Sequence, residues 1–455
     1  MIPIVTPQEM GAIDAAAPAP VEELIERAGR ATARAALDLL GGAYGRVVVV
    51  IAGRGNNGND GRSAARYLER RGVKVRVIDA TACPPTLPRC HLVIDAAYGT
   101  GFRGDWSAPD IESGPAERPL VLAVDIPSGV DALTGAAGSG VLAADRTVTF
   151  QALKPGLVFG AGRRLAGDVD VVDIGLDVSS ATQHLVESAD VAAWWPQRSG
   201  DAHKWKGAVR VIAGSPGMLG AGRLCAEAAA RSGAGLVTLS SPGIDPDARS
   251  EIIQRRIPAA DFHDDVFSDL DRFRALVIGP GLGRDEDTIA SARALIADAT
   301  VPVVVDGDGI FAAAWSAEGA GPLLRQRGRP TVITPHDGEY SLLTGDTPGP
   351  DRVAAARTLA ADIGAVVLLK GPTTVVATPE GEALVVDHGD ERLATAGSGD
   401  VLAGMIGALL AAAVAPGRAA AAAAWLHADA ASRGPRRGLL AGDIVELIPS
   451  ALGPL

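Results

Sequence analysis

The sequence predicts an α/β protein with two domains, each built around a mostly parallel β-sheet. Short apolar segments rich in β-branched residues alternate with segments of helical periodicity along nearly the whole chain. This alternation is typical of parallel strands joined by crossover helices. Glycine-rich or polar segments follow several of the predicted strands directly. The length of 455 residues is too great for one typical domain.

The composition indicates a protein with a sizeable core that does not bind nucleic acid. Hydrophobic residues make up 47% of the chain and charged residues 21%, and the net charge is −12. An acidic chain lacks the basic face that phosphate backbones demand. The three cysteines, Cys83, Cys90 and Cys225, provide neither a disulfide framework nor a metal-binding cluster. We therefore expect a reduced, cytoplasmic setting.

No membrane association is expected. The beginning of the sequence lacks the basic and apolar regions of a signal peptide. The longest apolar run, residues 401–415, is shorter than the roughly 18 residues that a membrane span needs. We interpret this run as a buried helix that is stopped by Pro416-Gly417-Arg418, and residues 419–427 as the next helix.

In the first half, a predicted strand runs into a glycine- and asparagine-rich loop. Residues 20–40 show helical spacing of apolar residues and end at Gly41-Gly42. The strand at 47–52 is followed by the loop 53–61 and then by another helix. Strand, glycine loop and helix form the mononucleotide-binding arrangement. Further strands are predicted at 73–79, 92–96, 120–125, 146–150 and 169–174.

Three polar clusters follow strands of this predicted sheet. The first is 56–60, the second is Asp95 with 99–105, and the third is 125–129. Because ligands bind at the carboxyl ends of parallel strands, the three clusters together favour a ligand site over ordinary capped turns. Their oxygen atoms suit either a hard cation or ribose and carboxamide groups.

These motifs, Asn-Asn-x-x-Asp in a glycine frame, Gly-Thr-Gly-Phe-x-Gly and Asp-Ile-Pro-Ser-Gly, resemble the NAD(P)H-hydrate epimerase family. The resemblance covers roughly residues 1–178 and implies a Rossmann-like domain over 1–180. It further implies interconversion of the R and S forms of hydrated NAD(P)H, with a bound potassium ion. By position, the substrate would contact Asn56, Asn57, Gly58, Asn59, Asp60, Gly99, Thr100, Gly101, Phe102, Arg103, Gly104, Asp105 and Asp125.

The same resemblance implies individual roles in this half. The potassium ion would lie at Asn57, Asp95 and Ser128, and Asp125 would be the catalytic residue. Lys154 also matches a family position, although the alternative is a lysine on the surface. Asn59 stands where the family usually has glycine; asparagine tolerates positive φ well enough for the loop to form.

A second α/β pattern begins after a linker that we place near residues 178–185. Its strands are predicted at 208–213, 235–240, 275–279, 301–306, 331–334, 366–370, 374–377 and 383–386. The most informative segment is 394–404, in which Gly397-Ser398-Gly399-Asp400 opens the apolar helix. Free backbone N–H groups and the helix dipole make such a turn an anion site. A carboxylate there would repel phosphate, so Asp400 is predicted to be a base for a hydroxyl that attacks a phosphoryl group.

Other predicted strand ends carry Gly-Pro-Gly-Leu-Gly at 279–283, Pro-His-x-Gly-Glu at 335–339 and Lys-Gly-x-x-Thr at 370–374. With the turn at 397–400, this set resembles the ribokinase-like superfamily and, more closely, the NAD(P)H-hydrate dehydratase family. The resemblance implies a ribokinase-like domain over 185–455 that uses ADP. By position, hydrated NAD(P)H would contact Ala221, Gly283, His336 and Asp400. The nucleotide would contact Lys370, Gly371, Pro372, Thr373, Thr374, Gly397, Ser398 and Gly399, and Glu339 would help to hold a magnesium ion.

The combined expectation is a bifunctional repair enzyme for NADH and NADPH hydrates that forms a homo-oligomer. ADP would be the phosphoryl donor, yielding AMP and phosphate. One alternative is a small-molecule kinase with a nucleotide-sensing first domain, and another is a first domain that serves only as a binding scaffold. The polar residues Asn57, Asp95, Asp125 and Ser128 argue against a pure scaffold, which would not need them.

Overall fold

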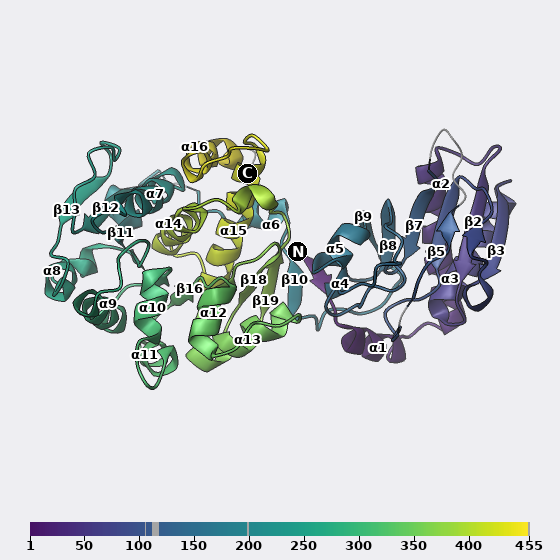
Figure 1. Ribbon diagram of the computed structural model, residues 1–455, viewed down its shortest axis with the longest axis horizontal. Coiled ribbons are helices and arrows are strands. Elements are labelled where there is room, and N and C mark those ends of the chain that lie inside the picture. Colours follow the sequence, from purple (N-terminus) through teal and green to yellow (C-terminus); the bar gives the residue numbers. More distant parts are fainter. Residues whose placement is uncertain (105, 112–117, 198–199, 454–455) are drawn as a thin grey trace. The chain divides into compact units, whose positions relative to one another are not determined.

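The computed structural model describes residues 1–104, 106–111, 118–197 and 200–453 (Figure 1). The predicted substrate contact Asp105 therefore lies outside the described residues. The chain divides into two compact units, residues 2–182 and residues 183–455, with Met1 joining the second. Each unit contains its own β-sheet surrounded by helices, as the α/β prediction requires.

The N-terminal unit is built on a fully parallel sheet with the strand order β3-β2-β5-β7-β8-β9. All strands predicted from the sequence of this unit are present, with ends that differ by one or two residues. Its elements are β1 (Ile2–Ile4), α1 (Pro7–Ala15), α2 (Val21–Leu40), β2 (Val47–Ala52), α3 (Asn56–Arg70), β3 (Lys74–Asp79), β4 (Thr86–Leu87), β5 (Leu92–Ala96), β6 (Asp110–Ile111), β7 (Leu120–Val124), β8 (Arg146–Phe150), α4 (Pro155–Val158), α5 (Gly162–Leu165) and β9 (Asp168–Val172).

The segment 56–61, predicted as a loop, instead forms the first turns of α3. Gly55 is the N-cap of this helix, and Asn59 has a helical conformation, so tolerance of positive φ is not required there. A Cβ atom at Gly58 would collide with the Gly53 carbonyl oxygen, and one at Gly61 would lie 2.5 Å from Cβ of Ala96. Glycine thus lets α3 start directly against β2 and β5, which brings its polar first turns to the sheet edge.

The sheet of the C-terminal unit contains the order β10-β19-β18-β17-β16-β15-β14-β11-β12-β13. Its pairs are parallel except for β17–β18 and β18–β19. The strands are β10 (Gln183–Leu185), β11 (Ala208–Ile212), β12 (Leu236–Ser241), β13 (Ile253–Arg256), β14 (Ala275–Ile278), β15 (Val303–Val305), β16 (Thr331–Ile333), β17 (Val366–Leu369), β18 (Thr374–Ala377) and β19 (Ala383–Val386).

Two of these strands were not predicted, because their sequences lack an apolar pattern. β10 includes glutamine and histidine and lies inside the segment assigned to the linker, and β13 is Ile-Gln-Arg-Arg. Both are held by pairing with neighbouring strands of the same sheet. The helices of this unit are α6 (Ser188–Trp194), α7 (Leu219–Arg231), α8 (His263–Phe267), α9 (Glu286–Asp298), α10 (Asp308–Ala314), α11 (Ala320–Gln326), α12 (Asp337–Thr344), α13 (Arg352–Ile363), α14 (Ser398–Ala411), α15 (Pro416–Ser432) and α16 (Ala441–Leu452).

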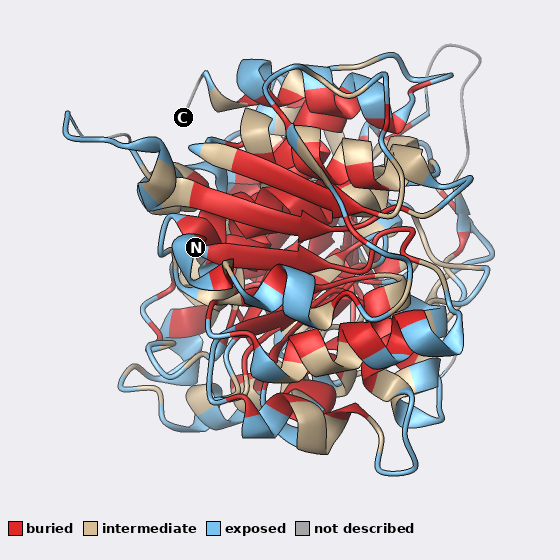
Figure 2. Ribbon diagram, turned by 90° about the vertical axis from the view of Figure 1, so that its left-hand side faces the viewer, coloured by how far each residue is buried: buried red, intermediate tan, exposed pale blue. Residues whose placement is uncertain are grey.

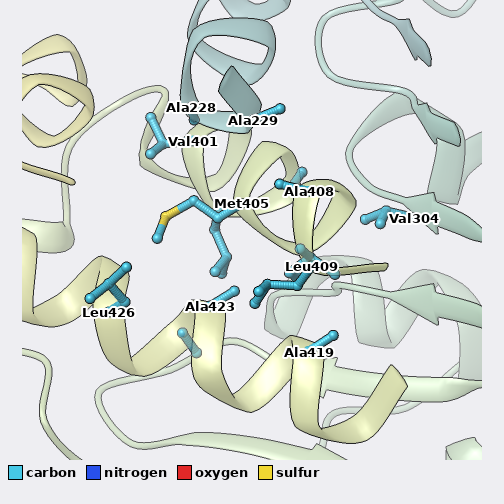
Figure 3. Close-up of a cluster of buried hydrophobic side chains, with 14 of the residues drawn as sticks. Ala228, Ala229, Val304, Val401, Met405, Ala408, Leu409, Ala419, Ala423 and Leu426 are labelled. Atoms are coloured by element: carbon cyan, nitrogen blue, oxygen red, sulfur yellow. The ribbon is translucent and has the colours of Figure 1, made fainter. Parts of the chain in front are cut away.

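The alanine-rich helices α7, α14 and α15 form a dense core with the sheet (Figure 3). Met405 and Leu409 of α14 lie between these helices, where small alanine side chains allow close approach. A Cβ atom at Gly404 would collide with the Cys225 carbonyl oxygen, so α14 meets α7 at backbone distance. This packing fixes the position of the first turn of α14.

The predicted extent of the apolar helix is wrong at its end. α14 stops at Ala411, after which Ala413 adopts positive φ and Val414 N–H donates to the Leu409 carbonyl. Pro416 does not stop that helix; it is the first residue of α15, where a missing N–H costs nothing. Figure 2 shows buried strands inside the molecule and exposed residues on outward helix faces. Across the described part of the chain, we find no helix with the length and apolar character needed to cross a bilayer.

Candidate active sites

A cavity of about 800 Å³ lies in the N-terminal unit, at the carboxyl ends of its strands. Most of the substrate contacts predicted in this unit line it: Asn56, Asn57, Asp60, Gly99, Thr100, Gly101, Phe102, Arg103 and Asp125. Gly58, Asn59 and Gly104 are described but are not among its lining residues. The cavity is also lined by Asp14 and Lys154, which come from α1 and from the segment after β8. It is large enough for a nucleotide-sized ligand.

Asp125 directly follows β7 and is held in an uncommon conformation, with φ of 67°. The ammonium group of Lys154 donates to its Oδ1 at 2.6 Å, and Thr149 Oγ1 donates to the same oxygen at 3.0 Å. Lys154 also donates to Thr149 Oγ1 and to the Phe150 carbonyl, and only 1% of its side chain is exposed. The surface-lysine alternative is therefore wrong. Backbone strain of this kind gathers at functional sites, because surrounding contacts must enforce it.

A second carboxyl group of the cavity, that of Asp60, lies in the second turn of α3. Burial raises its pKa to about 8, and the negative charges of Asp125 and Asp14 add to this effect against the charge of Lys154. Burial also raises the pKa of Asp14. At neutral pH the cavity therefore holds a protonated Asp60 near the Asp125–Lys154 ion pair. It thus offers both a proton donor and a proton acceptor.

The residues expected at a potassium ion lie beside this cavity. Ser128 donates to Asp95 twice, from its N–H at 2.9 Å and from its hydroxyl at 2.6 Å. The side-chain amide of Asn57 is buried, and neither of its polar atoms has a hydrogen-bond partner among the described residues. A buried amide oxygen without a donor is suited to a cation, and amide, hydroxyl and carboxylate oxygens are suitable ligands. These residues therefore fit a potassium ion.

The second site is at the beginning of α14. Gly397 is its N-cap with φ of 89°, a conformation that favours glycine, and Asp400 lies in the first turn. Burial raises the pKa of Asp400 to about 7; the charge of Asp306 raises it further, Lys370 opposes this, and Asp308 adds a smaller increase. A carboxylate with this pKa is half ionised near neutral pH, which suits a general base.

Lys370 follows β17 and reaches this turn. Its Nζ donates to Asp306 Oδ1 at 2.9 Å and lies 3.6 Å from Glu339 Oε2. A Cβ atom at Gly399 would be 3.6 Å from this Nζ, so the ammonium group lies beside the first turn of α14. Burial alone would lower the pKa of Lys370, but the two carboxylates outweigh it and the pKa is raised. A permanently protonated lysine at a helix N-terminus is suited to nucleotide phosphates.

His336 and Glu339 cap α12 together. His336 Nδ1 accepts from the N–H groups of Gly338 and Glu339, and Glu339 Oε2 accepts from the N–H of His336 at 2.9 Å. The side chain of His336 is 60% exposed, and its Nε2 lies 3.6 Å from Glu339 Oε2. No group of three or more His, Cys, Asp or Glu residues in the described segments could hold a metal ion. Magnesium can still be held by one carboxylate, such as Glu339, with nucleotide phosphates and water.

The remaining predicted contacts of this unit have identifiable local roles. The Ser398 hydroxyl donates to the Leu393 carbonyl at 2.8 Å, so it fixes the turn before α14. Residues 370–373 connect β17 to β18, whose first residue is Thr374; Thr373 is buried, and Arg352 donates to the Lys370 carbonyl at 2.7 Å. Ala221 is in the first turn of α7, and the N–H of Gly283 donates to Asp308 Oδ2 at 2.9 Å.

Sequence reasoning did not assign roles to Asp14, Asp306 or Arg352. Asp306 had a detectable signal, because it is the last residue of the predicted strand 301–306 and opens Asp-Gly-Asp-Gly at 306–309. Asp14 and Arg352 sit in ordinary helical patterns, and their local sequence carries no comparable signal.

Comparison with known proteins gives consistent matches for both units. Residues 209–449 match the family described as NAD(P)H-hydrate dehydratase, and residues 21–88 and 78–156 match that described as YjeF-related protein N-terminus. A protein of Moorella thermoacetica is 35% identical over 99% of this chain and 96% of its own length. One of Escherichia coli is 33% identical over 95% and 90%, and both are named bifunctional NAD(P)H-hydrate repair enzymes.

Among solved structures, a hypothetical protein of Streptococcus mutans superimposes with a TM-score of 0.50 and 23% identity. The match covers 59% of this chain and 99% of that one. At this identity the likeness concerns the fold alone.

Proposed function

We propose a function that starts from one established relationship: the chain belongs to the family of bifunctional NAD(P)H-hydrate repair enzymes. The protein is an enzyme that epimerises the R and S forms of hydrated NAD(P)H and dehydrates the S form. We assign epimerisation to residues 1–180 and dehydration to residues 185–455. The observation that carries the dehydratase assignment is Asp400, a base with a pKa of about 7 at a helix N-terminus that Lys370 adjoins.

In the dehydratase site, Asp400 accepts the proton of the ring hydroxyl of the S hydrate. The hydroxyl oxygen forms a bond to the terminal phosphorus of ADP while the bond from that phosphorus to AMP breaks. The ring nitrogen lone pair then expels phosphate from the ring carbon, and loss of a proton from the neighbouring carbon restores NAD(P)H. Phosphate is a better leaving group than hydroxide, and this explains why the dehydration consumes a nucleotide.

The other residues of this site bind and orient. Lys370 and the N-terminal turn of α14 supply positive charge where negative charge develops on the phosphoryl oxygens. Residues 371–374 contact the nucleotide, and His336, Ala221 and Gly283 contact the hydrated dinucleotide. Glu339 helps to hold magnesium, which supplies further charge neutralisation when it is bound.

In the epimerase site, Asp125 exchanges a proton with the hydrated ring, and the hydrogen bond from Lys154 holds this carboxyl group in position. Asp60 is protonated at neutral pH and can donate to the substrate. Asn57, Asp95 and Ser128 hold a potassium ion, which supplies a fixed positive charge near the substrate. A cytoplasmic location and homo-oligomeric assembly stay predictions of the sequence.

The deciding experiment is a time course of a mixed R and S hydrate with the purified chain, ADP and magnesium, followed by HPLC. Complete conversion of both epimers to NAD(P)H, with one AMP and one phosphate formed per turnover, is expected. Consumption of only the S hydrate would refute the epimerase assignment. A stable phosphorylated product would instead show a small-molecule kinase.

A further inference from the structure

Asp306 is the most deeply buried carboxylate near the dehydratase turn, and no role in the reaction described above belongs to it. It follows β15 and is 3% exposed. Its backbone is fixed by two hydrogen bonds, from its N–H to the Ile278 carbonyl and from the Gly309 N–H to its carbonyl. A buried carboxylate destabilises the folded state unless it is paired, so the partners of Asp306 indicate its role.

The two side-chain oxygens of Asp306 face different groups. Oδ1 accepts from Lys370 Nζ at 2.9 Å and from Thr334 Oγ1 at 2.6 Å. Oδ2 would lie 3.8 Å from a Cβ atom at Gly399, so it faces the first turn of α14. The carboxylate therefore bridges the end of β16, the end of β17 and the helix that carries the base.

We propose that Asp306 is a positioning residue for the dehydration reaction: it fixes the Lys370 ammonium group beside the first turn of α14 and places its carboxylate next to Asp400. The proposal rests on the function proposed for the C-terminal unit. Asp306 does not need to touch the substrate, because it acts through Lys370 and through its field at Asp400. Because Asp306 holds Lys370 in one conformation, the lysine loses little conformational entropy when it binds phosphate.

The charged and titratable groups around Asp400 come from several elements. Asp306 and Asp308 supply negative charge from the end of β15 and the start of α10, and Lys370 supplies positive charge. The Asp308 charge is offset by Arg284, whose Nε donates to it at 2.7 Å. Cys225 on α7 is buried with its pKa raised well above the usual value, and burial lowers the pKa of His427 on α15 to about 4. Both are therefore neutral, which leaves Asp306 as the main negative neighbour of Asp400.

The test compares Asp306→Asn with Asp308→Asn in the full chain. Initial rates of S-hydrate dehydration are measured with ADP and magnesium from pH 5.5 to 9. For Asp306→Asn we expect kcat/KM for ADP to fall by about tenfold to a hundredfold, because Lys370 loses its anchor. The acidic limb of the kcat profile should move down by roughly one pH unit, because a like charge has been removed. Asp308→Asn should move that limb less, since Arg284 already offsets its charge.

A folded Asp306→Asn protein with the acidic limb of the wild type would overturn the proposal. Circular dichroism and thermal unfolding establish folding. If Asp306→Asn does not fold, Thr334→Val is tested in its place. This substitution keeps the Asp306 carboxylate and removes the hydrogen bond that Thr334 donates to it. It should raise KM for ADP without moving the limb, and an unchanged KM would overturn the positioning role.

Failure of the proposed function is recognised separately. If the wild type does not turn over S hydrate, the function itself is wrong. The Asp400 carboxyl is then titrated by NMR in the wild type and in Asp306→Asn, with Asp400→Asn to assign its signal. A lower pKa in Asp306→Asn supports the charge effect of Asp306, and an equal pKa contradicts it.

Discussion

The two sites of this molecule use the same components and reach different protonation states. Each places an aspartate near the N-terminus of a helix that begins after glycine, Asp60 in α3 and Asp400 in α14, with a lysine nearby. Burial raises the pKa of Asp60 to about 8 and that of Asp400 to about 7. Asp60 is thus mainly protonated at neutral pH, whereas about half of Asp400 is ionised.

In both sites burial is the largest cause of the raised pKa, nearby carboxylates add to it, and a lysine lowers it. The two lysines differ in their exposure. Lys154 is 1% exposed, and its three donors go to Asp125, Thr149 and the Phe150 carbonyl. Lys370 is 21% exposed and lies beside the turn that carries Asp400. Lys154 is thus enclosed by its three acceptors. Lys370 also donates to a buried carboxylate, that of Asp306, but it keeps an exposed part that can meet phosphate.

The largest expected effect on the dehydratase site is that of Asp400→Asn. An amide cannot accept the hydroxyl proton, so dehydration should fall by about three orders of magnitude or more. ADP binding should stay near the wild-type value, because the turn and Lys370 are unchanged. Single-turnover rates and calorimetric titration with ADP measure the two effects. Dehydration at a near wild-type rate would show that another group is the base.

The corresponding substitution in the epimerase site is Asp125→Ala. Conversion of R to S hydrate should be lost, because the carboxylate that Lys154 holds is gone. Dehydration of pure S hydrate by the same protein should continue at the wild-type rate. The two activities are followed separately by HPLC. Equal loss of both would indicate misfolding, and retained epimerisation would exclude Asp125 as the catalytic residue.

The pH profiles should sharpen the comparison, because the two aspartates act in opposite protonation states. Dehydration requires ionised Asp400, so kcat should rise with pH and reach half its maximum near pH 7. Epimerisation requires protonated Asp60, so its rate should decline as the pH rises through about 8. Initial rates with pure epimers test both limbs. Two profiles with the same direction would contradict the contrast between the sites.

The smallest expected effect is on stability. In the folded protein Asp60 keeps its proton up to about pH 8, whereas in the unfolded chain it ionises near its ordinary pKa of 3.8. The folded state therefore binds an extra proton between these values, and stability declines as pH rises through this window. Asp60→Asn removes this decline, so its Tm at pH 8.5 should exceed that of the wild type by a few degrees. An equal or lower Tm would show that Asp60 is not buried as a neutral acid.

Local sequence patterns were sufficient for much of the fold. The apolar strand at Val47–Ala52 and the turn at Gly397 followed from β-branched runs and glycine chemistry, which act over a few residues. Strand-end motifs placed Asn57, Asp125 and Lys370 at sheet edges, because parallel strands bring their carboxyl ends together. β13 was not predicted, because its sequence lacks an apolar pattern and the strand is held by pairing with β12.

By itself the sequence determined the α/β class, the two sets of strand-end motifs, the family and the candidate base Asp400. Only the tertiary structure decided the chemical state of those residues. Lys154 meets Asp125 across 29 positions, and Lys370 meets Asp306 across 64. Burial and nearby charge set a pKa, and both come from segments far apart in the chain. Which carboxyl keeps its proton and which gives it up is therefore a property of the folded molecule.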